Sequence, residues 1–155
     1  MPFLAAPELQ FFADLSVRVG APQEVGMTPA GRRRVIPILG GDVRGEGWTA
    51  RVLPGGADFQ LIVGATTARL DARYVLETDA GDRIFVQNSA LRVASEEVTG
   101  KLMRGEPVDP AQVYFRCFPS FETSSQALSW INERLFVGTG IRMPEEVQIS
   151  CYLMR

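Results

Sequence analysis

The stretch RVLPGGADFQLIV, residues 51–63, joins a sharp turn to a strand whose two faces differ in polarity. Pro54-Gly55-Gly56 is predicted to be the turn, because proline fixes its own φ and glycine tolerates positive φ. Side chains alternate across the strand that follows, so two sets face opposite ways: Asp58, Gln60 and Ile62, and Phe59, Leu61 and Val63. The polar face either meets water or lines a cavity in which each polar group needs a hydrogen-bond partner.

Strand and turn signals of the same kind recur along the whole chain. Strands are predicted over residues 9–19, 33–39, 43–53, 58–63, 68–78, 82–88, 113–118, 133–140 and 147–154. Residues 20–32 contain several prolines and glycines and are predicted to form an irregular loop, while Gly40-Gly41 is predicted to end the strand 33–39. Pro37 cannot donate a hydrogen bond to a neighbouring strand, which indicates a sheet edge or a bulge.

Two short helices are predicted between these strands. Ser95 is placed to cap a helix that has Glu96 in its first turn and Gly105 just beyond its end. The spacing of Thr123 and Gln126 matches a capping box, which predicts a second helix that packs Trp130 against the sheet.

These elements predict an all-β fold with a single domain over residues 1–155. About nine strands with hairpin-length connections favour antiparallel pairing, and a closed sheet leaves no exposed edge. We therefore predict one antiparallel β-barrel of about 8–10 strands with one or two short helices. A β-sandwich is the alternative architecture. A barrel of this size can hold one small ligand in its interior.

Composition and charge exclude several classes of function. The net charge is −2 and the pI about 5.2, so the basic surface of a nucleic-acid-binding protein is missing. No apolar run has the length of a membrane span, and the N-terminal segment lacks a signal-type layout, so we expect a cytosolic protein without a membrane partner. The chain has no histidine, which removes histidine-based catalysis and the commonest metal ligand.

Cys117 and Cys151 lie in apolar strand-like stretches without the spacing of a metal site. We predict that both are buried free thiols. No metal site and no cofactor are therefore expected.

Several stretches together resemble a bacterial and fungal family named domain of unknown function 3237, also called uncharacterised protein family 0311. The matching stretches are GRRRVIPILGG (31–41), VLPGGADFQ (52–60), LDARYVLETD (70–79), GEPVDP (105–110), YFRCFPSFET (114–123), WINERLFVGTGIR (130–142) and VQISCYLM (147–154). The resemblance covers nearly the whole chain and implies an antiparallel β-barrel of the lipocalin or allene-oxide-cyclase kind. It also implies assembly into homo-oligomers, and it brings no settled activity.

Asp58 is the candidate proton carrier, because a carboxylate is the natural choice in a chain without histidine and burial can raise its pKa. Its alternative role is to bind the backbone of the preceding turn. Arg73 and Arg116 are candidates for stabilising an anion, and we group them with Asp58 as catalytic residues. The alternatives are an exposed ion pair of Arg73 with Asp71, and an Arg116 that reaches into solvent.

Further side chains are predicted to bind a ligand beside these three. They are Arg34, Gln60, Tyr74, Tyr114, Glu122, Trp130 and Asn132. Arg34 belongs to the basic run 32–34, which is either solvated or reaches a partner subunit or an anionic ligand. Glu122 and Asn132 have alternative roles as cap or turn partners. Either face of the strand 68–78 can point inward, because Tyr74 and Arg73 lie on opposite faces.

Three hypotheses about function follow from the sequence. The first is a cofactor-independent isomerase, cyclase or hydrolase that acts on a small hydrophobic or aromatic acid. The second is a carrier of such a ligand without catalysis, and the third is a structural protein that forms homo-oligomers. The first two require a cavity in which Asp58, Gln60, Arg73 and Arg116 converge, and both fail if Arg73 and Arg116 lie on opposite surfaces in bulk solvent.

Overall fold

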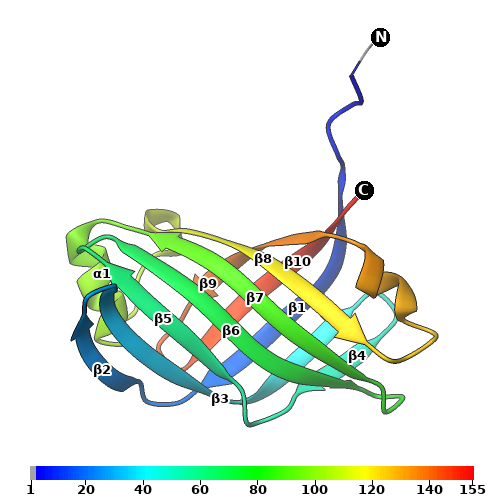
Figure 1. Cartoon of the computed structure of the whole chain (residues 1–155), viewed down its shortest axis with the longest axis horizontal. Helices are drawn as coiled ribbons and strands as arrows, with labels where there is room; N and C mark the ends of the chain where they lie inside the picture. The colour runs from blue at the N-terminus through cyan, green and yellow to red at the C-terminus, as the bar shows by residue number, and fades with distance from the viewer. Residues whose placement is uncertain (1–2) are drawn as a thin grey trace.

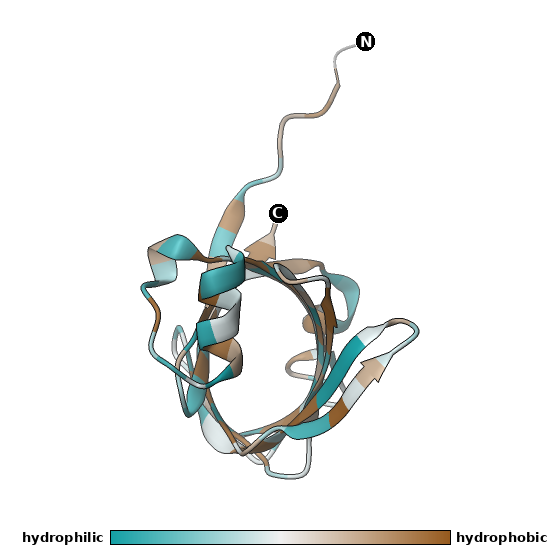
Figure 2. Cartoon of the chain, turned by 90° about the vertical axis from the view of Figure 1, so that its left-hand side faces the viewer, coloured by the Kyte–Doolittle hydropathy of each residue, from teal (hydrophilic) through white to brown (hydrophobic). Residues whose placement is uncertain are grey.

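The computed structural model describes residues 3–155 and contains one ten-stranded antiparallel sheet that closes into a barrel (Figures 1 and 2). The strands are β1 (Leu9–Val19), β2 (Gln23–Thr28), β3 (Gly31–Gly45), β4 (Thr49–Val52), β5 (Ala57–Val63), β6 (Thr67–Thr78), β7 (Arg83–Val93), β8 (Tyr114–Thr123), β9 (Phe136–Arg142) and β10 (Glu146–Met154). The closed wall has 8 strand positions, and 2 strands are additional. The predicted antiparallel barrel is confirmed.

The barrel closes through β3, which is long enough to pair with several strands. The second half of β3 pairs with β1, and β1 pairs with β10 on its other side. β4 and β5 both lie between β3 and β6, and the turn at Pro54-Gly55-Gly56 separates them. The predicted turn therefore interrupts one strand position of the barrel wall, with β4 before the turn and β5 after it.

Three predictions about the first part of the chain are wrong. Residues 20–32 are not an irregular loop, because β2 forms a hairpin with the start of β3. β3 also continues through Gly40-Gly41 to Gly45. The strand predicted over residues 43–53 is therefore divided, with its first residues in β3 and residues 49–52 in β4. Pro37 is tolerated in this long strand because it lies where β3 changes partner, between the last pair with β2 at Val35 and the first pair with β1 at Ile38.

Gly41 of β3 pairs with Val17 of β1 and lies close to the β1 backbone. Its φ is +152°, and a Cβ atom at this position would collide with the backbone carbonyl oxygen of Ser16. We expect Gly41→Ala to lower the free energy of unfolding by about 2–4 kcal/mol, measured by urea denaturation. Gly20→Ala is the matched control, because its Cβ would meet nothing closer than 3.4 Å. Equal stability of the two variants would contradict the close approach.

One predicted helix is confirmed and the other is not. The α-helix α1 (Glu96–Met103) begins after Ser95, whose Oγ accepts a hydrogen bond from Val98 N at 3.1 Å. No helix begins at Thr123, because that residue ends β8 and its hydroxyl donates to Arg83 O. Two short 3-10 helices occur instead within the described chain: η1 (Pro110–Gln112) and η2 (Ser129–Glu133).

The two ends of the barrel differ. At the end near η2, an aromatic cluster fills the interior, with ring centroids of neighbouring members 4.8–6.2 Å apart. The cluster consists of Phe12, Trp48, Phe121, Trp130 and Phe136. α1 lies at the other end, where Figure 2 shows it across the rim of the ring of strands. Within residues 3–155, no helix combines the length and apolar character needed to cross a bilayer.

Candidate ligand-binding site

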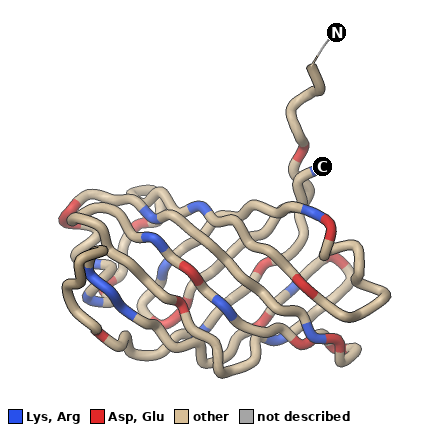
Figure 3. The backbone as a smooth tube through the Cα atoms, viewed as in Figure 1, with Lys and Arg blue, Asp and Glu red and all other residues tan. Residues whose placement is uncertain are grey.

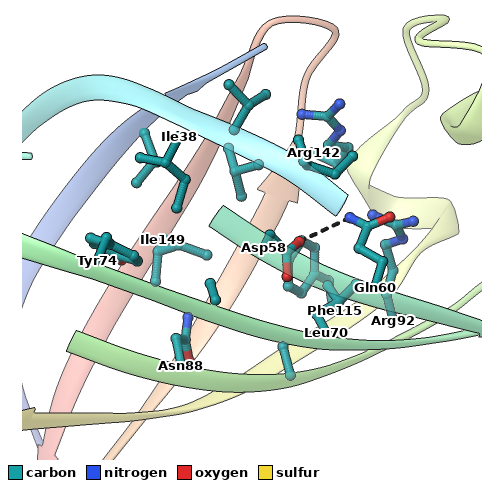
Figure 4. A pocket seen from close by; sticks show the side chains of 16 residues that line it. Ile38, Asp58, Gln60, Leu70, Tyr74, Asn88, Arg92, Phe115, Arg142 and Ile149 are labelled. Atoms are coloured by element: carbon teal, nitrogen blue, oxygen red, sulfur yellow. Dashed lines mark hydrogen bonds between the residues drawn. The ribbon is translucent and has the colours of Figure 1, made fainter. Parts of the chain in front are cut away.

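The interior of the barrel contains a cavity of about 50 Å³, and Figure 4 shows the side chains that line it. Its apolar wall consists of Val17, Val19, Ile36, Ile38, Leu70, Ala72, Ala90, Phe115, Val147 and Ile149. Its polar side chains are Asp58, Gln60, Tyr74, Asn88, Arg92 and Arg142. One buried water needs about 10–15 Å³, so the cavity holds a few water molecules or the polar end of a small ligand.

Asp58 and Gln60 both point inward from β5. The alternation of this strand predicted that they share a face and left open whether that face meets water or lines a cavity. Gln60 Nε2 donates a hydrogen bond to Asp58 Oδ2 at 2.9 Å. Part of the Asp58 residue reaches the surface, but its Oδ1 is buried and has no hydrogen-bond partner among residues 3–155. Burial raises the pKa of the Asp58 carboxyl, and the Gln60 hydrogen bond and the Arg92 charge oppose that rise.

Arg92 of β7 and Arg142 of β9 bring two positive charges to the same cavity. Arg92 is 4% exposed, and neither guanidinium forms an ion pair with a carboxylate in the described part of the chain. Burial and the Arg142 charge lower the pKa of Arg92 to about 10, and the Asp58 charge opposes this lowering. Arginine side chains are not deprotonated in proteins near neutral pH, so both keep their charge. The cavity therefore contains two unpaired cations and one carboxyl that resists ionisation.

Arg34 is buried at the same end of the barrel but does not line the cavity. Its Nε lies 2.9 Å from Glu24 Oε1 without the N–H direction of a hydrogen bond, and its Nη2 donates to Met103 O at 3.3 Å. Arg34 thus connects β3 to β2 and to the end of α1. Its positive charge also lowers the pKa of Arg92 and of Arg142, so it adds to the positive potential there.

A groove on the outside of the barrel adjoins the cavity. It runs between the end of α1 and the connection from β9 to β10, and its lining includes Met103 and Pro144. Arg142 and Val19 line both the groove and the cavity. Several Lys and Arg positions lie toward this end of the molecule (Figure 3). Arg142 therefore stands between the groove and the interior of the barrel.

The predicted convergence of Arg73 and Arg116 with Asp58 is wrong. Both arginines are exposed on the outer wall. Arg73 pairs with Asp71 at 3.0 Å, which is the alternative role considered from the sequence, and the Arg116 guanidinium lies 5.1 Å from the centre of the Tyr114 ring. The physical reason is alternation: Tyr74 faces inward on β6 and Phe115 faces inward on β8, so their neighbours face outward.

The other predicted ligand-binding residues divide between the interior and the surface. Tyr74 is 4% exposed and lines the cavity, whereas Tyr114 and Glu122 are exposed on the outside of β8. Trp130 packs in the aromatic cluster, 5.7 Å from the Phe12 ring. Asn132 accepts a hydrogen bond from Thr123 N at 2.8 Å and donates to Thr123 O at 3.0 Å. It is a turn partner, which was its alternative role.

Sequence reasoning missed Asn88, Arg92 and Arg142. The predicted strand 82–88 ended at Asn88, although the structure extends β7 to Val93 and keeps residues 84, 86, 88, 90 and 92 on the inward face. Continuing the alternation through QNSALRV would have placed Arg92 beside the core. Arg142 lies just beyond the predicted strand 133–140, and its inward position depends on its pairing with Val147. Among residues 3–155, no group of three or more acidic or cysteine residues is placed to hold a metal ion.

The raised pKa of Asp58 gives stability a predictable pH dependence. Its pKa in the folded protein lies above the ordinary value of 3.8, so its stabilising contribution is present below that value and is lost as the pH rises through the raised pKa. We expect Asp58→Asn, which cannot ionise, to gain in Tm over the wild type more at about pH 8 than at about pH 3.5. Asp71→Asn, on the surface, is the control. A difference that does not change with pH would contradict the raised pKa.

Comparisons with known proteins show what this chain is similar to. An uncharacterised protein of family UPF0311 from Rhodopseudomonas palustris is 42% identical over 145 residues, which cover 94% of this chain and 95% of that protein. A crystal structure of a conserved protein of unknown function from the same species has a TM-score of 0.93 at 39% identity, covering 98% of this chain and 100% of that one.

Two further solved structures share the fold. A β-barrel-like protein from Acinetobacter baumannii has a TM-score of 0.87 at 36% identity, and each chain is covered over its full length (100%). An enzyme from Penicillium herquei has a TM-score of 0.74 at 19% identity, covering 100% of this chain and 99% of that one, which shows likeness of fold alone. The family model described as protein of unknown function (DUF3237) matches residues 7–154. The chain therefore belongs to the DUF3237 family.

Proposed function

We propose that the barrel binds a small acid with an apolar body, that Arg92 and Arg142 bind its anionic group, and that Asp58 exchanges a proton with it. One observation carries this proposal: two guanidinium groups face a mostly apolar cavity and have no carboxylate partner in the described chain. Unpaired buried charges are unfavourable, and guanidinium groups bind carboxylates with two parallel hydrogen bonds. An anionic ligand would supply the missing partner.

The surroundings of Asp58 suit proton transfer. Gln60 occupies Oδ2 as a hydrogen-bond donor, so the proton of the neutral carboxyl belongs on Oδ1, the buried oxygen without a partner. From there it can pass to a bound ligand, and the carboxylate left behind is stabilised by the nearby charges of Arg92 and Arg142. The arginines would also stabilise an enolate. Isomerisation, cyclisation and hydrolysis of an acid are the reaction classes that fit these roles.

The fold is compatible with catalysis, since the barrel from Penicillium herquei is described as an enzyme. The carrier hypothesis predicts the same ligand and differs only in the absence of turnover. The same binding experiments therefore test both the enzyme and the carrier hypothesis. Homo-oligomerisation stays a prediction.

The test of the proposed function is a thermal-shift comparison of matched pairs of acids and their primary amides. Phenylacetate against phenylacetamide and hexanoate against hexanamide are suitable pairs, because only the acid carries a charge. A ligand at about 100 times its Kd adds about 2.7 kcal/mol to the stability of the folded state, which is a readily measured rise in Tm. We expect stabilisation by the acids and not by the amides. Equal effects of acid and amide, or none from either, would contradict the proposal.

A further inference from the structure

The cavity also contains buried acceptors to which no neighbouring side chain or backbone group of the described chain donates a hydrogen bond. Three buried acceptor oxygens have no hydrogen-bond partner among residues 3–155: Asp58 Oδ1, Gln60 Oε1 and Asn88 Oδ1. The Oδ1 of Asp58 carries its own proton when the carboxyl is neutral. The amide oxygens of Asn88 and Gln60 carry no proton, and these residues are only 5% and 3% exposed, so their oxygens need a hydrogen-bond donor. A simple carboxylate brings only acceptors, so it would pair with the arginines and leave these amide oxygens unsatisfied.

Asn88 lies at the far side of the cavity from the arginines. It stands at the same level as Asp58, since Asp58 pairs with Ala72 of β6 and Ala72 pairs with Asn88 of β7. The small side chain of Ala72 leaves open space between the two polar groups. Arg92 lies four residues further along β7, which is about 13 Å at 3.3 Å per residue. Figure 4 shows Asn88 and Arg92 at separate positions along the cavity wall.

The Asn88 amide leaves its oxygen without a partner. Asn88 Oδ1 is buried and accepts no hydrogen bond from any group among residues 3–155, whereas the amide nitrogen is not among the buried atoms without a partner. The carbonyl oxygen Oδ1 is therefore the atom left for a ligand.

We propose that the ligand of this barrel is a hydroxy acid. Its anionic group binds Arg92 and Arg142, and a hydroxyl at the other end of its apolar body donates a hydrogen bond to Asn88 Oδ1. Because the cavity of about 50 Å³ holds only a few water molecules, its apolar lining moves apart to admit the body of the ligand. The inference rests on the acid-binding function proposed above and adds the second polar group that selects the ligand. Asn88 is then the residue that determines specificity, because an acid without the hydroxyl displaces the water that would otherwise satisfy this oxygen.

The preference that this arrangement produces is measurable. A buried acceptor that loses its donor weakens binding by about 10- to 100-fold, and sites built around a substrate hydroxyl reject analogues that lack it. An ether in place of the hydroxyl can accept but cannot donate, so it should bind no better than the unsubstituted acid. This asymmetry separates hydrogen bonding to an acceptor from a simple effect of size.

The experiment is calorimetric titration of the wild type, Asn88→Leu and Gln87→Leu with two series of acids. The aromatic series is 4-hydroxyphenylacetate, phenylacetate and 4-methoxyphenylacetate, and the aliphatic series is 6-hydroxyhexanoate and hexanoate. Gln87 neighbours Asn88 on β7 and faces the outside, so its variant is the matched control. We expect the hydroxy acid of at least one series to bind the wild type and Gln87→Leu about 10- to 100-fold more tightly than its parent, with no such preference in Asn88→Leu.

Each contrary outcome has its own meaning. If the parent acids bind the wild type as tightly as the hydroxy acids, the hydroxy-acid inference is overturned while the acid-binding function stands. If no acid of either series binds, the proposed function itself fails. A hydroxyl preference that survives in Asn88→Leu overturns the assignment to Asn88. The comparison of hydroxy acids with their parent acids uses the wild type alone. It therefore tests the hydroxy-acid inference even if Asn88→Leu folds poorly.

Discussion

Replacing Arg92 with methionine is expected to weaken the binding of small acids at least about 100-fold, which corresponds to about 2.7 kcal/mol. Arg92 is buried in the cavity wall and has no carboxylate partner in the described chain, so a bound anion would be its principal partner. Methionine keeps much of the apolar stem and removes the charge. Calorimetric titration with phenylacetate or hexanoate measures the change. Arg73→Met, on the outer wall, should bind these acids as the wild type does.

The same substitution should not destabilise the protein without ligand. Burial lowers the pKa of Arg92, which means that the folded structure opposes its charge. We expect the free energy of unfolding of Arg92→Met to equal or exceed that of the wild type. Loss of binding together with loss of stability would point to a structural role, and retained binding would contradict the assignment of Arg92 to the ligand.

Replacing Asp58 with asparagine is expected to lower the rate of proton transfer to a bound acid by about 10²- to 10⁴-fold, because a positioned acid or base contributes that factor. Asparagine keeps the shape of the carboxyl but cannot give up or take a proton in its place. Incorporation of deuterium from D₂O into acids that bind, followed by NMR, measures the rate without knowledge of the product. Acid binding itself should persist, since Arg92 and Arg142 remain.

Asp71→Asn is the matched control, because Asp71 is a carboxylate on the outer wall that pairs with Arg73. Full exchange activity in Asp58→Asn would remove Asp58 from a catalytic role. Binding of acids by the wild type without any exchange or turnover would identify the barrel as a carrier. These two results are distinct, so the enzyme and carrier hypotheses can be separated by one set of measurements.

The sequence predicted those parts of the site that depend on local alternation alone. Asp58 and Gln60 follow a turn that only proline and glycine explain, and the strand after it has one wholly apolar face. The structure directs both polar side chains inward. The buried carboxyl with a raised pKa was also anticipated, because a chain without histidine has few other groups that can carry a proton near neutral pH.

The remainder of the site depends on which face of each strand turns inward, and alternation alone cannot decide that. On β6, both Tyr74 and Arg73 belong to regular alternating sets, and only closure of the barrel places Tyr74 inside and Arg73 outside. Arg92 was missed for a related reason. An arginine near the end of a strand is usually in solvent, and Arg92 is buried here because closure of the barrel places its face of β7 inside.

The fold itself was predicted at the level of the barrel, with local errors. β2 was hidden because Gly26 interrupts it and Pro22 and Pro29 flank it, and its pairing with β3 stabilises it regardless. The helix predicted at Thr123 failed because the Thr123 hydroxyl donates to Arg83 O across the sheet and accepts from Ser125 N. The spacing of Thr123 and Gln126, which resembles a helix cap, therefore occurs here at the end of a strand. From the sequence alone, this spacing looks the same in both cases.

A crystal structure of the protein grown with 4-hydroxyphenylacetate or 6-hydroxyhexanoate tests the proposed function most directly. The proposal predicts electron density for the acid inside the barrel, with its carboxylate within hydrogen-bonding distance of Arg92 and Arg142, and its body against the apolar wall toward Asp58. Density for the acid only on the outer surface, at a concentration where titration shows binding, would contradict it. So would an acid inside the barrel whose carboxylate points away from both arginines.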